Sequence, residues 1–220
     1  MTESKNYIAF FDVDKTIIHL NSAKVLVKKA REEGLMSLSG FLNAVYLVVL
    51  SKIKRKDTLK IIHRMGKWMD GIAVERFNKM VDEIHHDQII RAIRPEIIEE
   101  IRIHRENNAE IAILSSAVEA ICLPLAGFLG INQVLCTELE INDGCFTGNP
   151  VGKFCFGPEK LVRLKEFCSS RNYSLPDVYY YGDSIDDLPV LEHVGHPVCV
   201  APDKELLKVA RFNAWEIHQW

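Results

Sequence analysis

Short apolar runs that alternate with helical patterns predict an α/β fold: a doubly wound parallel sheet with an inserted all-helical cap. The runs are continuous in apolar character, which is typical of strands that a parallel sheet buries on both faces. Several of them are followed by a helical pattern with recognisable ends. The stretch 17–90 interrupts this alternation, because it contains helical patterns and no convincing strand.

The alternating part of the chain supplies the elements of the predicted core. Strands are expected at 7–11, 110–114, 133–136, 178–181 and 197–200, and helices at about 95–107, 118–130 and 158–170. Pro95 at a helix start and Gly130 after a helix end are the usual boundary residues. Residues 138–148 predict a hairpin that turns at Asn142-Asp143-Gly144.

The interrupted stretch predicts the cap. Helical patterns cover 21–33, closed by Gly34, an apolar segment that ends at Ser51, 57–70, closed by Gly71, and 73 to about 86. We therefore expect a catalytic core formed by 1–16 and 91–220, with a helical cap at 17–90 inserted after the first strand.

Composition limits the class of protein. The 220 residues are enough for one domain or a core with a small insert, and the hydrophobic share of 48% and charged share of 26% are those of an ordinary globular protein. A net charge of -3 gives no drive toward nucleic acid, which we do not expect as a partner. The cysteines form no CxxC pair, and residues 1–6 lack the apolar run of a signal peptide, so a cytoplasmic protein is expected.

The segment 34–51 contains no charged residue and is followed by Lys52, Lys54, Arg55 and Lys56. It approaches the roughly 20 residues that cross a bilayer, but serine, glycine and asparagine residues dilute it. We expect a buried cap helix here. Contact with a membrane surface and a dimer contact remain alternatives, and the oligomeric state does not follow from the sequence.

Acidic side chains follow the first strand. Asp12 and Asp14 are separated by one residue, and two carboxylates about 4 Å apart repel each other by roughly 4 kcal/mol at an effective dielectric constant of 20. The pair therefore predicts a cation between them.

Other strand ends carry polar side chains of related kinds. Ser115 and Ser116 follow the second strand, and Asp183, Asp186 and Asp187 follow the fourth. Because ligands of doubly wound sheets bind beyond the carboxyl ends of the strands, we expect these side chains at one edge.

Lys160 lies in the first turn of the helix after Pro158, from where it could reach the same edge. Lys153 is a nearby alternative. Together with the acids, one lysine suits phosphoryl transfer through a phosphorylated aspartate: a carboxylate attacks phosphorus, a second acid moves the proton, and oxygen ligands hold Mg²⁺.

Four segments together resemble the haloacid dehalogenase superfamily, in particular its phosphoserine-phosphatase-like branch with a helical cap. They are Phe11-Asp12-Val13-Asp14-Lys15-Thr16, Ile113-Leu114-Ser115, Lys160, and Gly182-Asp183-Ser184-Ile185-Asp186-Asp187. With the cap, the resemblance covers almost the whole chain. It implies a phosphatase that hydrolyses a small phosphorylated metabolite.

The resemblance also implies residue roles. Asp12 is expected to be the nucleophile, and Asp14 the general acid and base. Asp12, Asp183 and the backbone carbonyl of Asp14 are the expected Mg²⁺ ligands. Asp187 is expected to hold a metal-bound water or Lys160.

The remaining expected contacts are to the phosphoryl group. Ser115 and Lys160 are expected to bind it, with Ser116 beside them, and Thr16 is expected to steady the loop. Lys15 departs from the glycine common at its place in the family.

Alternatives remain open. The same intermediate could pass its phosphoryl group to an acceptor alcohol, or the protein could bind a phosphorylated ligand without turnover. The histidines lack metal-ligand spacing, which disfavours zinc. Asp14-Lys15-Thr16 is also similar to the phosphorylation motif of P-type ion pumps, but Ile17-Ile18 replaces its Gly-Thr and the sequence predicts no set of membrane spans, so we reject this interpretation.

Substrate choice is the least determined feature. Phosphoserine phosphatases usually carry a glutamate nine residues beyond the nucleophile, where it holds the substrate amine, and this chain has Asn21 there. The resemblance therefore disfavours phosphoserine, because an amide provides no charge-assisted partner for an ammonium group.

Overall fold

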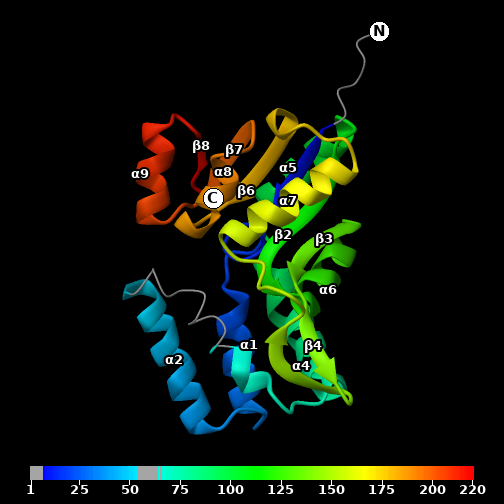
Figure 1. Ribbon diagram of the computed structural model, residues 1–220, viewed down its shortest axis with the longest axis vertical. Coiled ribbons are helices and arrows are strands. Elements are labelled where there is room, and N and C mark those ends of the chain that lie inside the picture. Colours follow the sequence, from blue (N-terminus) through cyan, green and yellow to red (C-terminus); the bar gives the residue numbers. More distant parts are fainter. Residues whose placement is uncertain (1–6, 54–63, 65) are drawn as a thin grey trace.

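The computed structural model describes residues 7–53, 64 and 66–220, and it contains a six-stranded sheet with helices on both faces (Figure 1). The strand order is β3-β2-β1-β6-β7-β8, and every neighbouring pair is parallel. The strands are β1 (Ile8–Phe11), β2 (Glu110–Val118), β3 (Gln133–Thr137), β6 (Val178–Gly182), β7 (His196–Val200) and β8 (Glu216–His218). The predicted doubly wound parallel sheet is confirmed.

Side chains of β1 alternate between two hydrophobic cores, as expected for a strand covered on both faces. Ala9 and Phe11 belong to one core, which also contains residues of α5 (Pro95–Glu106) and α6 (Glu119–Leu129). Ile8 and Phe10 belong to the other, with α7 (Pro158–Ser170), α8 (Leu188–Leu191) and α9 (Lys204–Phe212). The sheet is therefore the middle layer of three.

Two strands differ from the sequence prediction. Strand β2 extends through Ser115 and Ser116 to Val118, with an irregular register against β3 between Leu114 and Val118. Strand β8 was not predicted, because its three residues are too few to show a pattern. The predicted strands at 7–11, 133–136, 178–181 and 197–200 agree with the structure to within one residue at each end.

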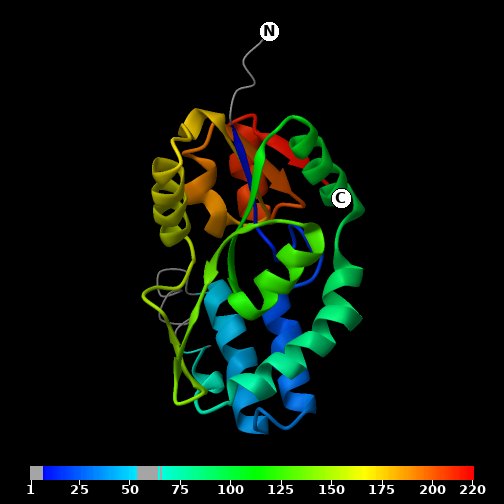
Figure 2. The same cartoon turned by 90° about the vertical axis from the view of Figure 1, so that its right-hand side faces the viewer.

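The inserted segment is helical where the structure describes it. It contains α1 (Ser22–Glu32), α2 (Leu38–Ile53) and α4 (Val74–Ile84), which lie together beyond the carboxyl end of β1 in both views (Figures 1 and 2). Asn21 caps α1 by accepting a hydrogen bond from the backbone N–H of Lys24. The predicted helix at 57–70 lies mostly outside the described residues, and its final part forms a short 3-10 turn, Lys67–Met69.

The hairpin of β4 (Leu139–Asn142) and β5 (Cys145–Pro150) packs against these helices. Asp143 and Gly144 at its turn have φ of 49° and 76°, as a two-residue hairpin turn requires. The ring of Phe146 lies 5.0 Å from that of Phe77 in α4, and Ala73 pairs with Cys145. The division into a core of 1–16 and 91–220 and a cap of 17–90 stays a prediction, and these contacts favour adding the hairpin to the cap.

Helix α2 is less buried than expected. Ala44 and Leu47 are buried, whereas Leu38, Leu42 and Tyr46 are more than half exposed. For residues 38–47, whose burial the structure describes, the expectation of a buried helix therefore holds for one face only. In the described part of the chain, no helix has the length and apolar character that crossing a membrane requires.

A polar network is buried on the α5 face of the sheet. The hydroxyl group of Tyr181 donates to Glu100 (2.9 Å), so the His104 Nε2–H must donate to Tyr181 (2.9 Å), and His104 Nδ1 accepts from Tyr7 (3.1 Å). Burial lowers the pKa of His104 to about 4, while the charge of Glu216 opposes the shift and His196 adds to it. The folded protein therefore favours a neutral imidazole at this position.

We predict that His104 makes the free energy of unfolding decrease as the pH falls from about 6.5 to about 4. In this window the unfolded chain binds a proton at His104 that the folded chain excludes, so the free energy of unfolding decreases by up to roughly 3 kcal/mol as the pH falls. Urea denaturation of wild type and His104→Gln should give a stability difference that shrinks over this window. The exposed His193→Gln is the control. A pH-independent difference for His104→Gln would contradict the prediction.

Candidate active site

The ends of β1 and β6 place two acids side by side. These strands are parallel neighbours, and the backbone N–H of Asp12 continues their pairing by donating to Tyr181 O at 3.0 Å. Asp12 and Asp183 therefore leave the sheet at adjacent points, and both are about 95% buried. The expectation that these two strand ends meet at one edge agrees with this geometry.

Lys160 joins Asp12 to Asp187. Its Nζ lies 3.0 Å from Asp12 Oδ1 and 2.7 Å from Asp187 Oδ1, and the side chain is almost fully buried. Pro158 starts α7, so Lys160 stands in the first helical turn and reaches back to the sheet edge. The alternative, Lys153, is exposed and pairs with Glu159 at 3.3 Å.

Tyr180 completes this network, and the sequence did not reveal it. Lys160 Nζ donates to the Tyr180 hydroxyl (3.1 Å), which in turn donates to Asp187 Oδ1 (2.7 Å). The three ammonium hydrogens of Lys160 therefore have three acceptors: Asp12, Asp187 and Tyr180. In the sequence, a tyrosine inside an apolar strand is indistinguishable from a core residue.

Asp187 is fixed from two further directions. The backbone N–H and the hydroxyl group of Ser184 both donate to Asp187 Oδ2, at 3.3 and 3.2 Å. A Cβ atom on Gly182 would lie 2.9 Å from this same oxygen, so only glycine leaves room for the carboxylate. Asp187 is thus packed against the end of β6.

Burial sets the protonation behaviour of the acids. It raises the pKa of Asp12 to about 6, although Lys160 opposes the shift. It raises the pKa of Asp183 to about 8, and the negative charges of Asp187 and Asp12 add to that shift. Burial also acts on Asp187, but the charge and hydrogen bonds of Lys160 and the Tyr180 hydrogen bond hold its pKa below the usual value.

Asp14 makes its hydrogen bonds outside the network of Lys160, Asp12 and Asp187. Its Oδ1 accepts from the backbone N–H of Ser22 (2.9 Å), and its Oδ2 accepts from the side-chain amide of Asn21 (3.1 Å). Burial raises the pKa of Asp14 against the effect of the Ser22 hydrogen bonds. Its carboxylate is therefore positioned by the start of α1, the first helix of the inserted segment.

The hydroxyl residues occupy different places. Ser115 is fully buried and accepts from the backbone N–H of Ala117 at 3.2 Å, whereas its neighbour Ser116 is exposed. Thr16 is fully buried, and its hydroxyl has no hydrogen-bond partner in the described part of the chain.

A hollow of about 190 Å³ opens beside these groups. It is lined by Asp12, Asp14, Lys15, Asn21, Ser116, Phe156, Gly157, Lys160, Asp183, Ser184, Asp186 and Asp187. The predicted acids and Lys160 therefore share one surface.

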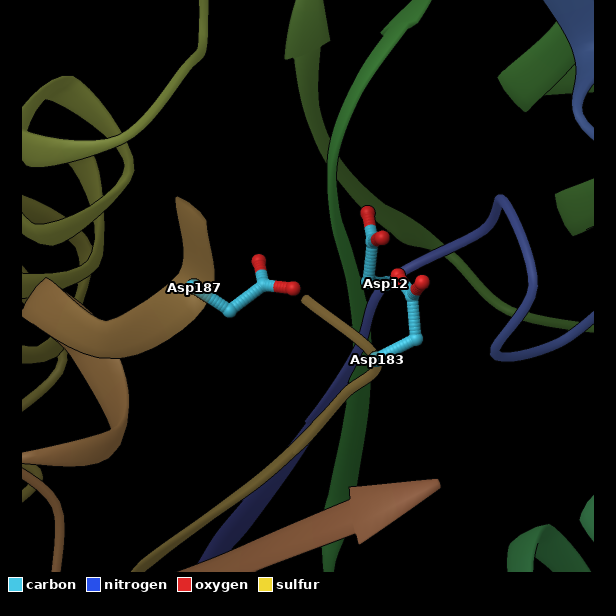
Figure 3. A group of neighbouring side chains, drawn as sticks. All are labelled: Asp12, Asp183 and Asp187. Carbon is cyan, nitrogen blue, oxygen red and sulfur yellow. The ribbon is translucent and has the colours of Figure 1, made fainter. Parts of the chain in front are cut away.

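Three carboxylates could hold a metal ion. One oxygen from each of Asp12, Asp183 and Asp187 lies within 4.8 Å of the others, and the carboxylates converge from two sides (Figure 3). Oxygen donors suit a hard cation such as Mg²⁺. Lys160 compensates Asp12 and Asp187, whereas the ammonium group that contacts Asp183 within the described residues is that of the half-exposed Lys15, at 3.4 Å. The donor set and the raised pKa of Asp183 fit a divalent ion bound here.

Comparisons with known proteins agree on one family. A model of haloacid dehalogenase-like hydrolases matches residues 9–192. A probable phosphatase of Mycobacterium tuberculosis is 31% identical over 95% of this chain and 74% of its own length. A histidinol-phosphatase of Neisseria meningitidis is 28% identical over 96% of this chain and 97% of its own length. A substrate-bound phosphoserine phosphatase structure has a TM-score of 0.73 at 15% identity, covering 99% of this chain and 95% of that one.

We predict that Lys160 is required for stability without metal. Lys160→Ala would leave Asp12 and Asp187 buried without their cation, at a cost of about 3–5 kcal/mol in the free energy of unfolding. Urea denaturation at pH 8 in chelator-treated buffer measures this cost. Lys153→Ala removes an exposed ion pair and should change stability by less than about 1 kcal/mol. Equal effects of the two variants would contradict the prediction.

Proposed function

Because the chain belongs to the haloacid dehalogenase-like hydrolases and is a phosphatase of that family, we propose that it hydrolyses a small organic phosphate monoester through a phosphorylated Asp12. The observation that carries the proposal is the position of Asp12. Its carboxylate lies at the hollow, 3.0 Å from the buried ammonium group of Lys160, and Asp14 follows two residues later.

In the first step, an Asp12 carboxylate oxygen attacks phosphorus. The new bond to Asp12 forms as the bond between phosphorus and the ester oxygen breaks. Lys160 is held by Asp12, Asp187 and Tyr180, so its positive charge stands beside the Asp12 carboxylate before the substrate arrives. Such a preorganised charge stabilises the negative charge of the transferring group.

Asp14 moves the proton in both steps. It protonates the leaving alkoxide, and in the second step the resulting carboxylate takes a proton from the water that attacks phosphorus. The bond between Asp12 and phosphorus then breaks and releases inorganic phosphate. Hydrogen bonds from Asn21 and Ser22 hold Asp14 at the hollow, and its raised pKa suits a group that must carry a proton.

The proposed Mg²⁺ ligands are Asp12, Asp183 and the backbone carbonyl of Asp14. When bound, the ion would neutralise negative charge on the phosphoryl oxygens. Asp187 lies within reach of the same position, but Lys160, Tyr180 and Ser184 already occupy its oxygens. We therefore assign Asp187 to holding Lys160.

The hollow and Asn21 restrict the substrate. A volume of about 190 Å³ admits a small monoester. Asn21 donates to Asp14 and accepts from Lys24, so both ends of its side chain are engaged within the protein. It provides no carboxylate for a substrate amine, which supports a monoester other than phosphoserine. We propose that the helices of 17–90 cover the hollow as a cap.

We expect Asp12→Asn to abolish phosphate release from a panel of monoesters with Mg²⁺, by at least about 10³-fold, because the amide cannot form the covalent intermediate. Phosphate assay and acid-quench trapping of the phosphorylated protein measure both events. Wild-type activity in the variant would show that Asp12 is not the nucleophile. Transfer to added alcohols in preference to water would instead identify a phosphotransferase, and binding without turnover a phospho-ligand binding protein.

Asp14→Asn should separate the two steps. With an aryl phosphate, whose leaving group needs no proton, the variant should still form the phosphorylated Asp12 but hydrolyse it about 10²–10⁴-fold more slowly. A burst of one aryl alcohol per protein molecule, followed by slow turnover, is the expected time course. With an alkyl phosphate, no burst is expected. Equal slowing of burst and turnover would exclude Asp14 as the base of the second step.

A further inference from the structure

Lys15 adopts a backbone conformation that lysine rarely takes. It lies in the loop after β1, and its φ is 59°, in the left-handed region that favours glycine. A residue other than glycine in this region is strained, and such strain persists only where the surroundings impose it.

The surroundings of Lys15 do fix its backbone. Its N–H donates to Leu20 O at 3.0 Å, and its carbonyl accepts from Arg94 Nη2 at 3.2 Å. Arg94 is itself held to the loop, because its backbone N–H donates to Ile17 O at 2.9 Å. The loop therefore presents the side chain at position 15 to the hollow in a fixed direction.

The ammonium group of Lys15 reaches the acidic cluster from the solvent side. Its Nζ lies 3.4 Å from Asp183 Oδ2, and the Lys15 side chain is 51% exposed whereas that of Asp183 is 7% exposed. The contacts of Lys160 are shorter, at 2.7 and 3.0 Å, and its side chain is 4% exposed. A long contact with a half-exposed partner is the weaker kind of ion pair, so Lys15 is the more easily displaced cation.

We propose that Lys15 is a tethered counter-cation of Asp183, which competes with the divalent ion for this carboxylate and thereby weakens Mg²⁺ binding. The inference rests on the proposed metal site. An ion bound by this carboxylate comes close to the ammonium group on its Oδ2, so the two like charges repel each other even if the ammonium group moves aside. Lys160 has no such effect, because its partners keep it in place.

The test is calorimetric titration of the substrate-free protein with Mg²⁺ alone, at constant ionic strength. Lys15→Asn removes the charge and retains a residue that tolerates positive φ, and it should bind Mg²⁺ about tenfold more tightly, equivalent to about 1.4 kcal/mol. Lys15→Gly should behave in the same way. Lys15→Arg keeps the charge and should stay within about twofold of wild type.

Lys28→Asn is the matched control. Lys28 pairs with Glu32 at 3.8 Å on the exposed surface of α1 and does not line the hollow. Its replacement removes the same charge from the chain and should leave Mg²⁺ affinity unchanged. An increase equal to that of Lys15→Asn would mean that only net charge matters, and it would overturn the inference.

Two other results would also overturn it: unchanged or weaker Mg²⁺ binding by both Lys15→Asn and Lys15→Gly, or tighter binding by Lys15→Arg. Phosphate release by the wild-type protein, measured separately, tests the proposed function. A protein that binds Mg²⁺ as expected in all variants but hydrolyses no monoester retains the inference and loses the proposed function. A protein that hydrolyses a monoester but binds Mg²⁺ with equal affinity in all variants retains the proposed function and loses the inference.

Discussion

The concentration of buried carboxylates beside one buried ammonium group is the constraint on which the rest of the site depends. Asp12, Asp183 and Asp187 would repel each other strongly at the ends of the strands, and Lys160 offsets this repulsion for two of them. The third, Asp183, has the half-exposed Lys15 as its cationic contact. The three carboxylates therefore outnumber the buried cations, and the arrangement fits one more positive charge at the edge of the sheet.

The strands and helices of the core bring these charged side chains together. Parallel pairing of β1 with β6 brings residues far apart in the sequence to adjacent positions, and the first turn of α7 delivers Lys160 between them. Gly182 allows Asp187 to pack against the strand end. The hydroxyl group of Tyr180 contacts both Lys160 and Asp187 and so holds them in place relative to each other. Asp14 is positioned separately, by the start of α1, so the group proposed to transfer protons is tied to the inserted helices.

Much of this could be predicted from the sequence, because strand ends in a parallel sheet meet at a common edge. Asp12 and Asp183 were assigned to this edge on that basis, and Lys160 from its place in the first turn of a helix. The structure brings the three side chains together. Tyr180 could not be found, since its hydroxyl contacts depend on which face of β6 meets α7. The hydrogen bonds of the Asn21 side chain to Asp14 and Lys24 likewise depend on how its helix packs. Strand β8 was missed because three residues carry no periodicity.

The contact between the hairpin and the inserted helices has a mechanical consequence. The chain visits this region once after β1 and again after β3, and the two visits are joined where Ala73 pairs with Cys145 and Phe77 meets Phe146. A rotation of the helices that keeps these two contacts must therefore bend the backbone both after β1 and after β3. The proposed cap would therefore move as one unit made of the helices and the hairpin.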